Sequence, residues 1–289
     1  MNVLPWIYAA RPKTLVASIV PVVSATLILP DKHIFKLDLF LFTIIAAMII
    51  QIVTNYVNDL YDFLKGADQD RVGPIRMIQS GLLSQSAIKK AISLLIIFGI
   101  LCGIPLAIQG GWPIIIIGLS SFLLAYLYTA GPFPLAYHGL GDLFVFIYFG
   151  VIAVTGTYYL QIGFVDQSAI YLGIAIGANN IILLTINNLR DYHTDKNSNK
   201  KTLIVLFGKK FGGIEVATMW LVSYISFFLL SLELGNYSLF YIILLSIPLA
   251  LNISYDTYTL SGEKLNKTLA KIASLLILQS ILLGIGIYI

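Results

Sequence analysis

The scarce acidic side chains of this sequence gather in two clusters, and the first lies within residues 55–70. Only 14 of the 289 residues are Asp or Glu. Asn55, Asp59 and Asp62 stand at i, i+4 and i+7, so their side chains line one face of a helix. Like charges on one helical face repel each other. A bound divalent cation would remove this repulsion, and the stripe therefore indicates a metal site.

The second cluster has nearly the same spacing. Asn187, Asp191 and Asp195 stand at i, i+4 and i+8, again on one helical face. An Asn-x-x-x-Asp pair therefore begins at both Asn55 and Asn187. From this repeat we predict one domain over residues 1–289, built from two related halves of about 1–130 and 131–289.

Two carboxylate stripes of this kind suit Mg²⁺ that is shared with a diphosphate. Mg²⁺ prefers carboxylate oxygens, keeps several waters and often bridges to substrate phosphates. We therefore predict magnesium as the cofactor, with basic side chains neutralising the remaining phosphate charge. The simpler interpretation, solvated helix ends beside a membrane, applies best to the loop acid Asp68. The predicted metal ligands are Asp59, Asp62, Asp68, Asp191 and Asp195, and the predicted diphosphate-binding residues are Asn55, Asn58, Lys65, Arg71, Arg76, Asn187, Lys200 and Lys201.

The segments that carry these clusters are apolar enough to cross a bilayer. The chain is 58% hydrophobic and 11% charged, with a mean hydropathy of +0.89. Soluble domains are about a quarter charged, so this composition excludes a water-soluble globule. The single cysteine, Cys102, lies in an apolar run and excludes a disulfide framework. Nine apolar segments approach the roughly 20 residues that span a bilayer core: about 14–30, 38–58, 91–109, 112–129, 142–160, 168–189, 213–231, 236–255 and 268–289.

Lysine and arginine give this all-α, multi-pass protein an orientation. With a cytoplasmic N-terminus, only Lys32 and Lys36 of the 18 basic residues fall on the outer side. Both acidic clusters then emerge at the cytoplasmic face, and the C-terminus lies outside. The net charge of +4 is accordingly assigned to loops beside the lipid bilayer, with no nucleic acid as partner.

Several short motifs follow one another along the chain: 11–15 (RPKTL), 58–62 (NDLYD), 65–68 (KGAD), 71–76 (RVGPIR), 79–81 (QSG), 139–142 (GLGD), 187–191 (NNLRD) and 200–203 (KKTL). Their order and spacing resemble the UbiA superfamily of intramembrane aromatic prenyltransferases over nearly the whole chain. The likeness is greatest to the branch that prenylates 1,4-dihydroxy-2-naphthoate. Two positions depart from the superfamily pattern: Gly66 stands where a third acid is usual, and Asn199 stands where glycine is common.

The resemblance implies a fold, a reaction and a place in the cell. About nine helices would surround a central cavity that opens sideways to lipid in a bacterial cytoplasmic membrane. The enzyme would transfer a polyprenyl group from polyprenyl diphosphate to 1,4-dihydroxy-2-naphthoate, releasing carbon dioxide and pyrophosphate, in menaquinone biosynthesis. The catalytic residues would be Asp59, Asp62, Asp191 and Asp195, and weaker candidates for binding the acceptor or shielding the allylic cation are Arg11, Tyr128, His138, Tyr148, Tyr158 and Arg190.

Two alternatives stay open at this point. A sister enzyme would use another acceptor, such as 4-hydroxybenzoate, homogentisate, or a haem or chlorophyll precursor, with the same metal chemistry. A multi-pass lipid or anion transporter would also use intramembrane carboxylates, although transport sites usually lie nearer the middle of the bilayer. Prenyl chain length and oligomeric state are not set by these patterns.

Overall fold

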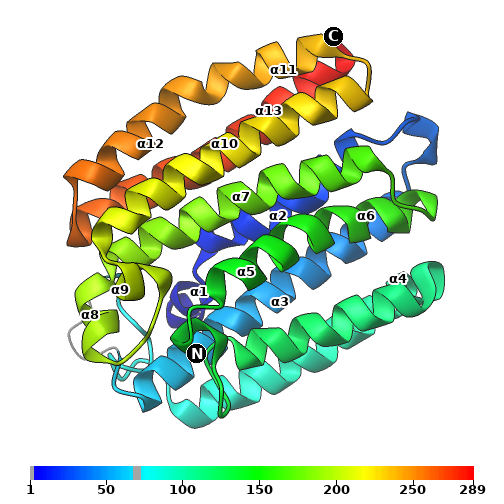
Figure 1. Ribbon diagram of the computed structural model, residues 1–289. Coiled ribbons are helices and arrows are strands. Elements are labelled where there is room, and N and C mark those ends of the chain that lie inside the picture. The colour runs from blue at the N-terminus through cyan, green and yellow to red at the C-terminus, as the bar shows by residue number, and fades with distance from the viewer. Residues whose placement is uncertain (1–2, 68–72) are drawn as a thin grey trace.

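The computed structural model describes residues 3–67 and 73–289, and it is a bundle of helices without strands over these ranges. The long helices run side by side along one direction (Figure 1). The helices are α1 Leu4–Ala10, α2 Pro12–Leu27, α3 Leu37–Leu64, α4 Gln85–Leu127, α5 Gly141–Phe146, α6 Ala153–Ile162, α7 Gln167–Arg190, α8 Tyr192–Asn197, α9 Leu203–Phe207, α10 Lys209–Glu233, α11 Tyr237–Ile243, α12 Ile247–Thr259 and α13 Leu265–Tyr288, with short 3-10 turns at Lys32–Ile34, Leu135–Tyr137, Leu244–Ser246 and Gly262–Lys264 and a π-helical turn at Ile147–Ile152.

Seven helices of the described residues are long and apolar enough to cross a membrane, against nine predicted segments. The predicted segments at about 91–109 and 112–129 both lie in α4, which has 43 residues. The first predicted segment corresponds mainly to α2, which has only 16 residues. The protein is therefore an all-helical, multi-pass membrane protein in its described parts, and the predicted number of nine crossings stays a prediction.

A glycine divides α4 into two antiparallel legs. Gly111 has φ 64° and ψ −151°, a backbone conformation that only glycine adopts readily. The two legs then lie against each other, because a Cβ at Gly99 in the first leg would meet the Phe122 ring of the second leg at 2.5 Å. The predicted separation of the apolar segments at about 91–109 and 112–129 is confirmed, since the chain leaves the helical conformation at Gly111, between them.

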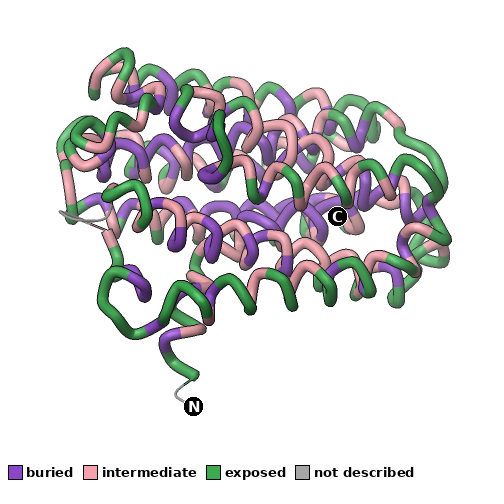
Figure 2. Tube along the Cα trace, turned by 90° about the horizontal axis from the view of Figure 1, so that it is seen from below, coloured by how far each residue is buried: buried purple, intermediate pink, exposed green. Residues whose placement is uncertain are grey.

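Helix α7 lies at the centre of the bundle. It packs against α10, α13, α6 and the π-helical turn. The approach to that turn is close because both sides carry glycine: a Cβ at Gly150 would lie 2.3 Å from the Cα of Gly177. Buried residues follow the inner sides of the helices and exposed residues the outer sides, as Figure 2 shows. Most of the α7 surface that would otherwise face lipid is thus covered by protein.

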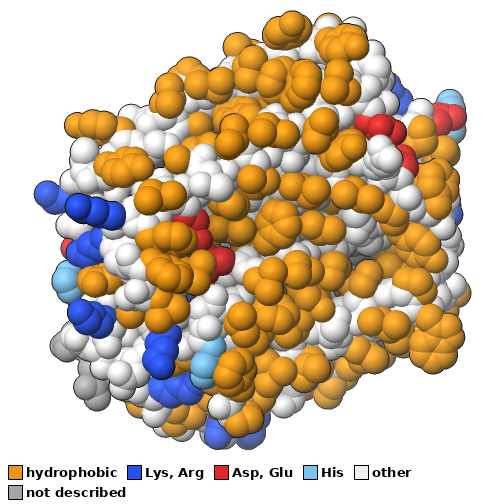
Figure 3. Space-filling model, viewed as in Figure 1, with side chains coloured by type: hydrophobic (Ala, Val, Ile, Leu, Met, Phe, Trp, Pro, Cys, Tyr) orange, Lys and Arg blue, Asp and Glu red, His pale blue; other side chains and the backbone are white. Residues whose placement is uncertain are grey.

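The two ends of the bundle differ in charge. Helices α3 and α7 both finish at the end where the N-terminus lies, and the C-terminus lies at the opposite end (Figure 1). On the face shown in Figure 3, lysine and arginine gather at the end where α3 and α7 finish, whereas hydrophobic side chains cover most of the rest. The acidic clusters therefore share one basic end of a largely apolar surface.

Candidate active site

A cavity of about 530 Å³ runs into the bundle from the end where α3 and α7 finish. Its walls come from α2, α3, α4, α5, the π-helical turn, α6 and α7. Away from the acidic end its lining is mainly small and aliphatic, with residues such as Ala47, Gly103 and Ile117. The acidic end is polar and carries Asn55, Asn58, Asp62, Arg76, Asn187, Asp191, Asp195 and Lys200.

The first acidic cluster forms the buried C-terminal part of α3. Asp62 accepts hydrogen bonds from the Tyr137 hydroxyl at Oδ1 and from Arg76 Nη2 at Oδ2, both at 3.0 Å. Asp59 Oδ2 accepts from the backbone N–H of Met77 at 3.2 Å. Met77 is held against α3, because its side chain packs into the hydrophobic cluster that contains Leu60. Apolar packing thus places a cation and a backbone donor against the carboxylates.

The two asparagines of this cluster have structural partners. Asn55 Nδ2 donates to Ala10 O at 2.9 Å and to the Thr14 hydroxyl at 3.0 Å, so it ties α3 to the start of α2. Asn58 Oδ1 accepts from the Thr129 hydroxyl. Both asparagines also line the cavity. They therefore fix the position of the α3 end as well as forming part of its polar wall.

The second acidic cluster lies where α7 ends and α8 begins. Arg190 Nε and Nη2 donate to the two carboxylate oxygens of Asp191 at 2.8 and 2.5 Å. Arg190 also donates to Asn187 Oδ1 at 2.8 Å and to Asn266 Oδ1 at 3.1 Å. Both charged side chains are buried. The guanidinium therefore holds the carboxylate of Asp191 in a fixed orientation.

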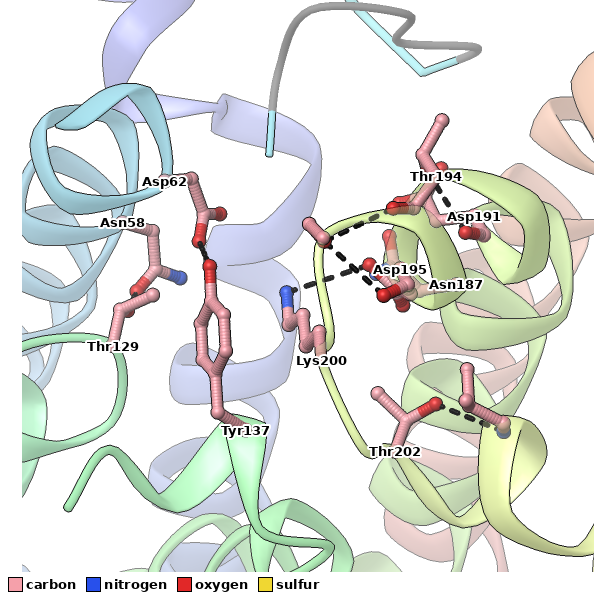
Figure 4. A network of polar contacts seen from close by, with 12 residues as sticks. Asn58, Asp62, Thr129, Tyr137, Asn187, Asp191, Thr194, Asp195, Lys200 and Thr202 are labelled. Atoms are coloured by element: carbon pink, nitrogen blue, oxygen red, sulfur yellow. Dashed lines mark hydrogen bonds and ion pairs between the residues drawn. The ribbon is translucent and has the colours of Figure 1, made fainter. Parts of the chain in front are cut away.

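Tyr137 stands between the two clusters, as Figure 4 shows. Its hydroxyl bonds to Asp62 on one side, while Lys200, on the other side, makes a 3.8 Å ion pair with Asp195. The ammonium groups of Lys65 and Lys200 lie 4.1 and 5.5 Å from the Tyr137 ring centre. Burial lowers the pKa of Lys65, the charge of Asp62 opposes that shift, and the charge of Lys200 adds to it.

The donor atoms suit Mg²⁺, although no three His, Cys, Asp or Glu residues of the described chain form one compact metal group. Carboxylate and amide oxygens from both clusters line the same cavity. Mg²⁺ usually takes one or two carboxylates and completes its shell with phosphate oxygens and water. Asp62, Asp191 and Asp195 therefore fit as partial ligand sets on opposite walls. The predicted site residues Asp68 and Arg71 lie outside the described residues.

The weaker candidates divide into those that line the cavity and those that do not. Arg11, Tyr128 and Tyr148 line it. Burial, and then the charges of Asp142, Asp195 and Asp62, raise the pKa of Tyr128 well above its usual value. The tyrosine therefore lies within electrostatic reach of both walls.

The other candidates have different surroundings. His138 stacks on Phe133 at 3.7 Å, in a separate cavity of about 370 Å³ that Lys65 and Lys201 also line. Tyr158 is buried in a hydrophobic cluster and bonds to Asp166, the N-cap residue of α7. Tyr158, His138 and Lys201 are absent from the lining of the main cavity among the described residues. Arg190 lies behind Asp191 rather than in that lining.

Sequence reasoning missed Tyr137 and did not single out Asp142 as a site residue. Tyr137 follows two prolines in the connection between α4 and α5, and proline-rich connections carry no periodic signal that reveals what they contact. Asp142 belongs to the motif GLGD and lies in the first turn of α5, where it lines the cavity. A lone acid at the start of an apolar segment was the available signal for it.

Comparison with protein families and curated sequences gives consistent results. The family model described as the UbiA prenyltransferase family matches residues 18–275. The chain is 37% identical over 203 residues, 70% of each chain, to a protein of Mycobacterium tuberculosis named 1,4-dihydroxy-2-naphthoate octaprenyltransferase. It is 28% identical to a protein of the same name from Haemophilus influenzae, over 98% of this chain and 96% of that protein.

Solved structures show the same fold. A UbiA homologue from Archaeoglobus fulgidus, bound to GPP and Mg²⁺, superposes with a TM-score of 0.68 at 15% sequence identity. The match covers 99% of this chain and 100% of that structure. At this identity the likeness shows a common arrangement of helices.

Proposed function

Because the chain belongs to the UbiA prenyltransferase family, we propose that it transfers a polyprenyl group from polyprenyl diphosphate to 1,4-dihydroxy-2-naphthoate. The products are demethylmenaquinol, carbon dioxide and pyrophosphate. The observation that carries the proposal is one cavity that joins two acidic walls to a long apolar interior. The names of the curated relatives support naphthoate as the acceptor.

The diphosphate binds between the two walls. Asp62 faces it from α3, and Asp191 and Asp195 face it from α7 and α8. These carboxylates would hold Mg²⁺, which would supply Lewis-acid stabilisation of the pyrophosphate charge. Lys200, paired with Asp195 at 3.8 Å, lies where it can add a positive charge to the same group.

The polar groups around each carboxylate fix its direction before substrate arrives. Asp62 is held by Tyr137 and Arg76, and Asp191 is held by Arg190. An ionised carboxylate has about four lone-pair sites, so oxygens that already accept one bond keep capacity for a metal or a substrate donor. Such preorganisation avoids reorientation during the reaction.

The apolar part of the cavity takes the prenyl chain and keeps water from the allylic cation. Aromatic faces stabilise a cation by roughly 0.5–2 kcal/mol each. Tyr148, from the π-helical turn, presents such a side chain in the lining. We place this end of the bundle in the cytoplasm, because lysine and arginine favour that side of a membrane.

A prenyl-transfer assay on the purified, detergent-solubilised protein tests the function. The assay supplies farnesyl diphosphate, Mg²⁺ and either 1,4-dihydroxy-2-naphthoate or 4-hydroxybenzoate, with and without EDTA, and identifies products by mass. We expect a decarboxylated prenyl-naphthoquinol and released pyrophosphate, both formed only when Mg²⁺ is present. Product from 4-hydroxybenzoate alone would overturn the acceptor but keep the reaction class. Absence of product from folded protein with either acceptor would contradict the proposal.

A further inference from the structure

Asp142 is a buried carboxylate that faces the cavity. It lies in the first turn of α5, its relative exposure is 6%, and it forms part of the cavity lining. Among the residues that the structure describes, no basic side chain forms an ion pair with it. Burying a carboxylate in this way costs free energy unless something binds to it.

One oxygen of Asp142 is unpaired within residues 3–67 and 73–289. No donor of the described residues lies within hydrogen-bonding distance of Asp142 Oδ1. The Oδ1 atom of Asn180, in the same lining, is also without a partner there, while Asn180 Nδ2 donates to Phe149 O at 2.9 Å. Leaving a buried acceptor unpaired costs about 1–3 kcal/mol, so native proteins rarely do so without a use. These two unpaired acceptors in the cavity wall therefore indicate a ligand that carries hydrogen-bond donors.

Asp142 lines the same cavity as the carboxylates that we assign to the diphosphate. The Tyr128 hydroxyl is close to the start of α5, because a Cβ at Gly141 would lie 3.0 Å from it. The charges of Asp142, Asp195 and Asp62 all act on this same tyrosine. Asp142 therefore lines the same cavity as Asp62 and Asp195 and acts electrostatically on a tyrosine that both of them also affect.

We propose that Asp142 Oδ1 accepts a hydrogen bond from a hydroxyl of the aromatic acceptor and takes its proton during prenyl transfer. The inference rests on the proposed function, because it assigns a residue to the acceptor of that reaction. The chemistry that recognises the acceptor is a phenolic hydroxyl next to the ring carbon that is alkylated.

The electrons and protons of this step balance. The C–O bond of the prenyl diphosphate breaks, and its electron pair leaves with pyrophosphate. The ring carbon that carries the carboxylate forms a bond to the allylic carbon while the neighbouring O–H proton passes to Asp142, giving a ketone at that oxygen. The carboxylate then leaves as carbon dioxide, its bonding electrons enter the ring, and Asp142 returns the proton to the oxygen.

The test compares Asp142→Asn with the matched control Glu215→Gln. Glu215 is also a buried carboxylate of the bundle, on α10, but it bonds to Thr185 at 2.8 Å and does not line the cavity. Asparagine keeps the shape of Asp142 but cannot accept the proton. Positioned proton transfer contributes about 10²–10⁴-fold, so kcat should fall by that order in Asp142→Asn alone. Asp142→Glu should recover part of it.

Two further readouts separate proton transfer from a structural role. Affinity for Mg²⁺ and farnesyl thiolodiphosphate, a non-reacting analogue, should be unchanged in Asp142→Asn. Its residual kcat/KM for the naphthoate should rise with pH, because an acceptor that has already lost its proton needs no base. Tyr128 and Glu215 are titratable groups whose charges couple to that of Asp142. A shift of the pH profile in Glu215→Gln therefore measures that coupling, whereas the rise of residual kcat/KM with pH should appear in Asp142→Asn alone.

The outcomes distinguish the two proposals. If the unmodified protein prenylates the naphthoate and Asp142→Asn has the same kcat and pH profile, Asp142 is not the proton acceptor and the proposed function stands. If Asp142→Asn loses activity together with analogue binding or folding, the residue is structural and the inference is wrong. If the unmodified protein itself does not use the naphthoate, the proposed function fails first.

Discussion

The hydroxyl of Tyr137 donates a 3.0 Å hydrogen bond to Oδ1 of Asp62, although 75 residues separate the two in sequence. The backbone carbonyl of Tyr137 accepts from the N–H of Lys201 at 3.2 Å. One residue of the connection between α4 and α5 thus touches the α3 cluster and the loop after α8. The two acidic walls of the cavity are held in register by this connection.

Removing the Tyr137 hydroxyl should weaken the use of prenyl diphosphate. A hydrogen bond to a charged group contributes about 1.5–3 kcal/mol, which corresponds to roughly tenfold or more in kcat/KM. Tyr137→Phe keeps the ring under Lys65 and Lys200 and should lower kcat/KM for the diphosphate by about that factor. Steady-state kinetics with varied farnesyl diphosphate measure it.

The matched control is Tyr126→Phe, which also removes a hydroxyl hydrogen bond, the 2.8 Å contact with Tyr61, but outside the cavity lining. It should leave kcat/KM within about twofold. Equal losses in both variants would show that the effect belongs to general packing and not to Asp62.

Metal removal should abolish activity, and the carboxylates should set how much Mg²⁺ is needed. EDTA should stop prenyl transfer and excess Mg²⁺ should restore it. Asp62→Asn and Asp195→Asn each remove one anionic ligand, and we expect kcat to fall by about 10²-fold or more. Titrating Mg²⁺ in each variant gives the apparent metal affinity.

Asp38→Asn is the control for this series, because Asp38 lies exposed in the first turn of the same helix as Asp62, at its other end. Its Mg²⁺ dependence should equal that of the unmodified protein. Full activity of Asp62→Asn or Asp195→Asn at low Mg²⁺ would refute a metal role for that residue.

Arg190 should contribute to the stability of the fold, through its pair with Asp191, rather than to binding of the acceptor. Its guanidinium is buried and bonded to both oxygens of Asp191, and breaking a buried pair by removing one partner costs about 3–5 kcal/mol. Arg190→Gln should therefore lower the midpoint of thermal unfolding in detergent by several degrees. The exposed Lys210→Gln is the control for loss of one positive charge. An unchanged midpoint with a raised KM for the naphthoate would instead show that Arg190 binds the acceptor carboxylate.

Local periodicity made the two acidic walls predictable, but not their partners. The i, i+4 spacing of Asn55 and Asp59 was enough to place both on one face of a helix, which α3 bears out. The pairing of Arg190 with Asp191 and the arrival of Tyr137 at Asp62 depend on how separate helices pack. No residue pattern within one segment reveals such contacts. The sequence therefore suggested Arg190 as an acceptor-binding residue without showing that its guanidinium is paired with Asp191.

One departure from the family pattern turned out to be compatible with the loop it occupies. Asn199 adopts φ 56°, a left-handed conformation for which glycine is the usual residue. Asparagine tolerates this region better than other side chains do. The substitution therefore keeps the turn that brings Lys200 back toward Asp195. The relation between the two halves of the chain stays a prediction.

The length of prenyl chain accepted should depend on two glycines of α4. Gly103 and Gly118 lie on its two legs, both line the cavity, and a Cβ at either would meet no atom within 4 Å. A larger side chain there would project into the space that we assign to the prenyl chain. Gly118→Leu should therefore lower kcat/KM for octaprenyl diphosphate by about tenfold, since overfilling an apolar site costs roughly 1–3 kcal/mol. Farnesyl diphosphate, which is shorter, should be turned over within about twofold of the unmodified rate.

Gly118→Ala, whose single methyl group finds open space, is the graded control and should leave kcat/KM unchanged for both substrates. A parallel loss with both substrates in Gly118→Leu would mean that the chain does not pass this point, and that the tail lies along another part of the cavity.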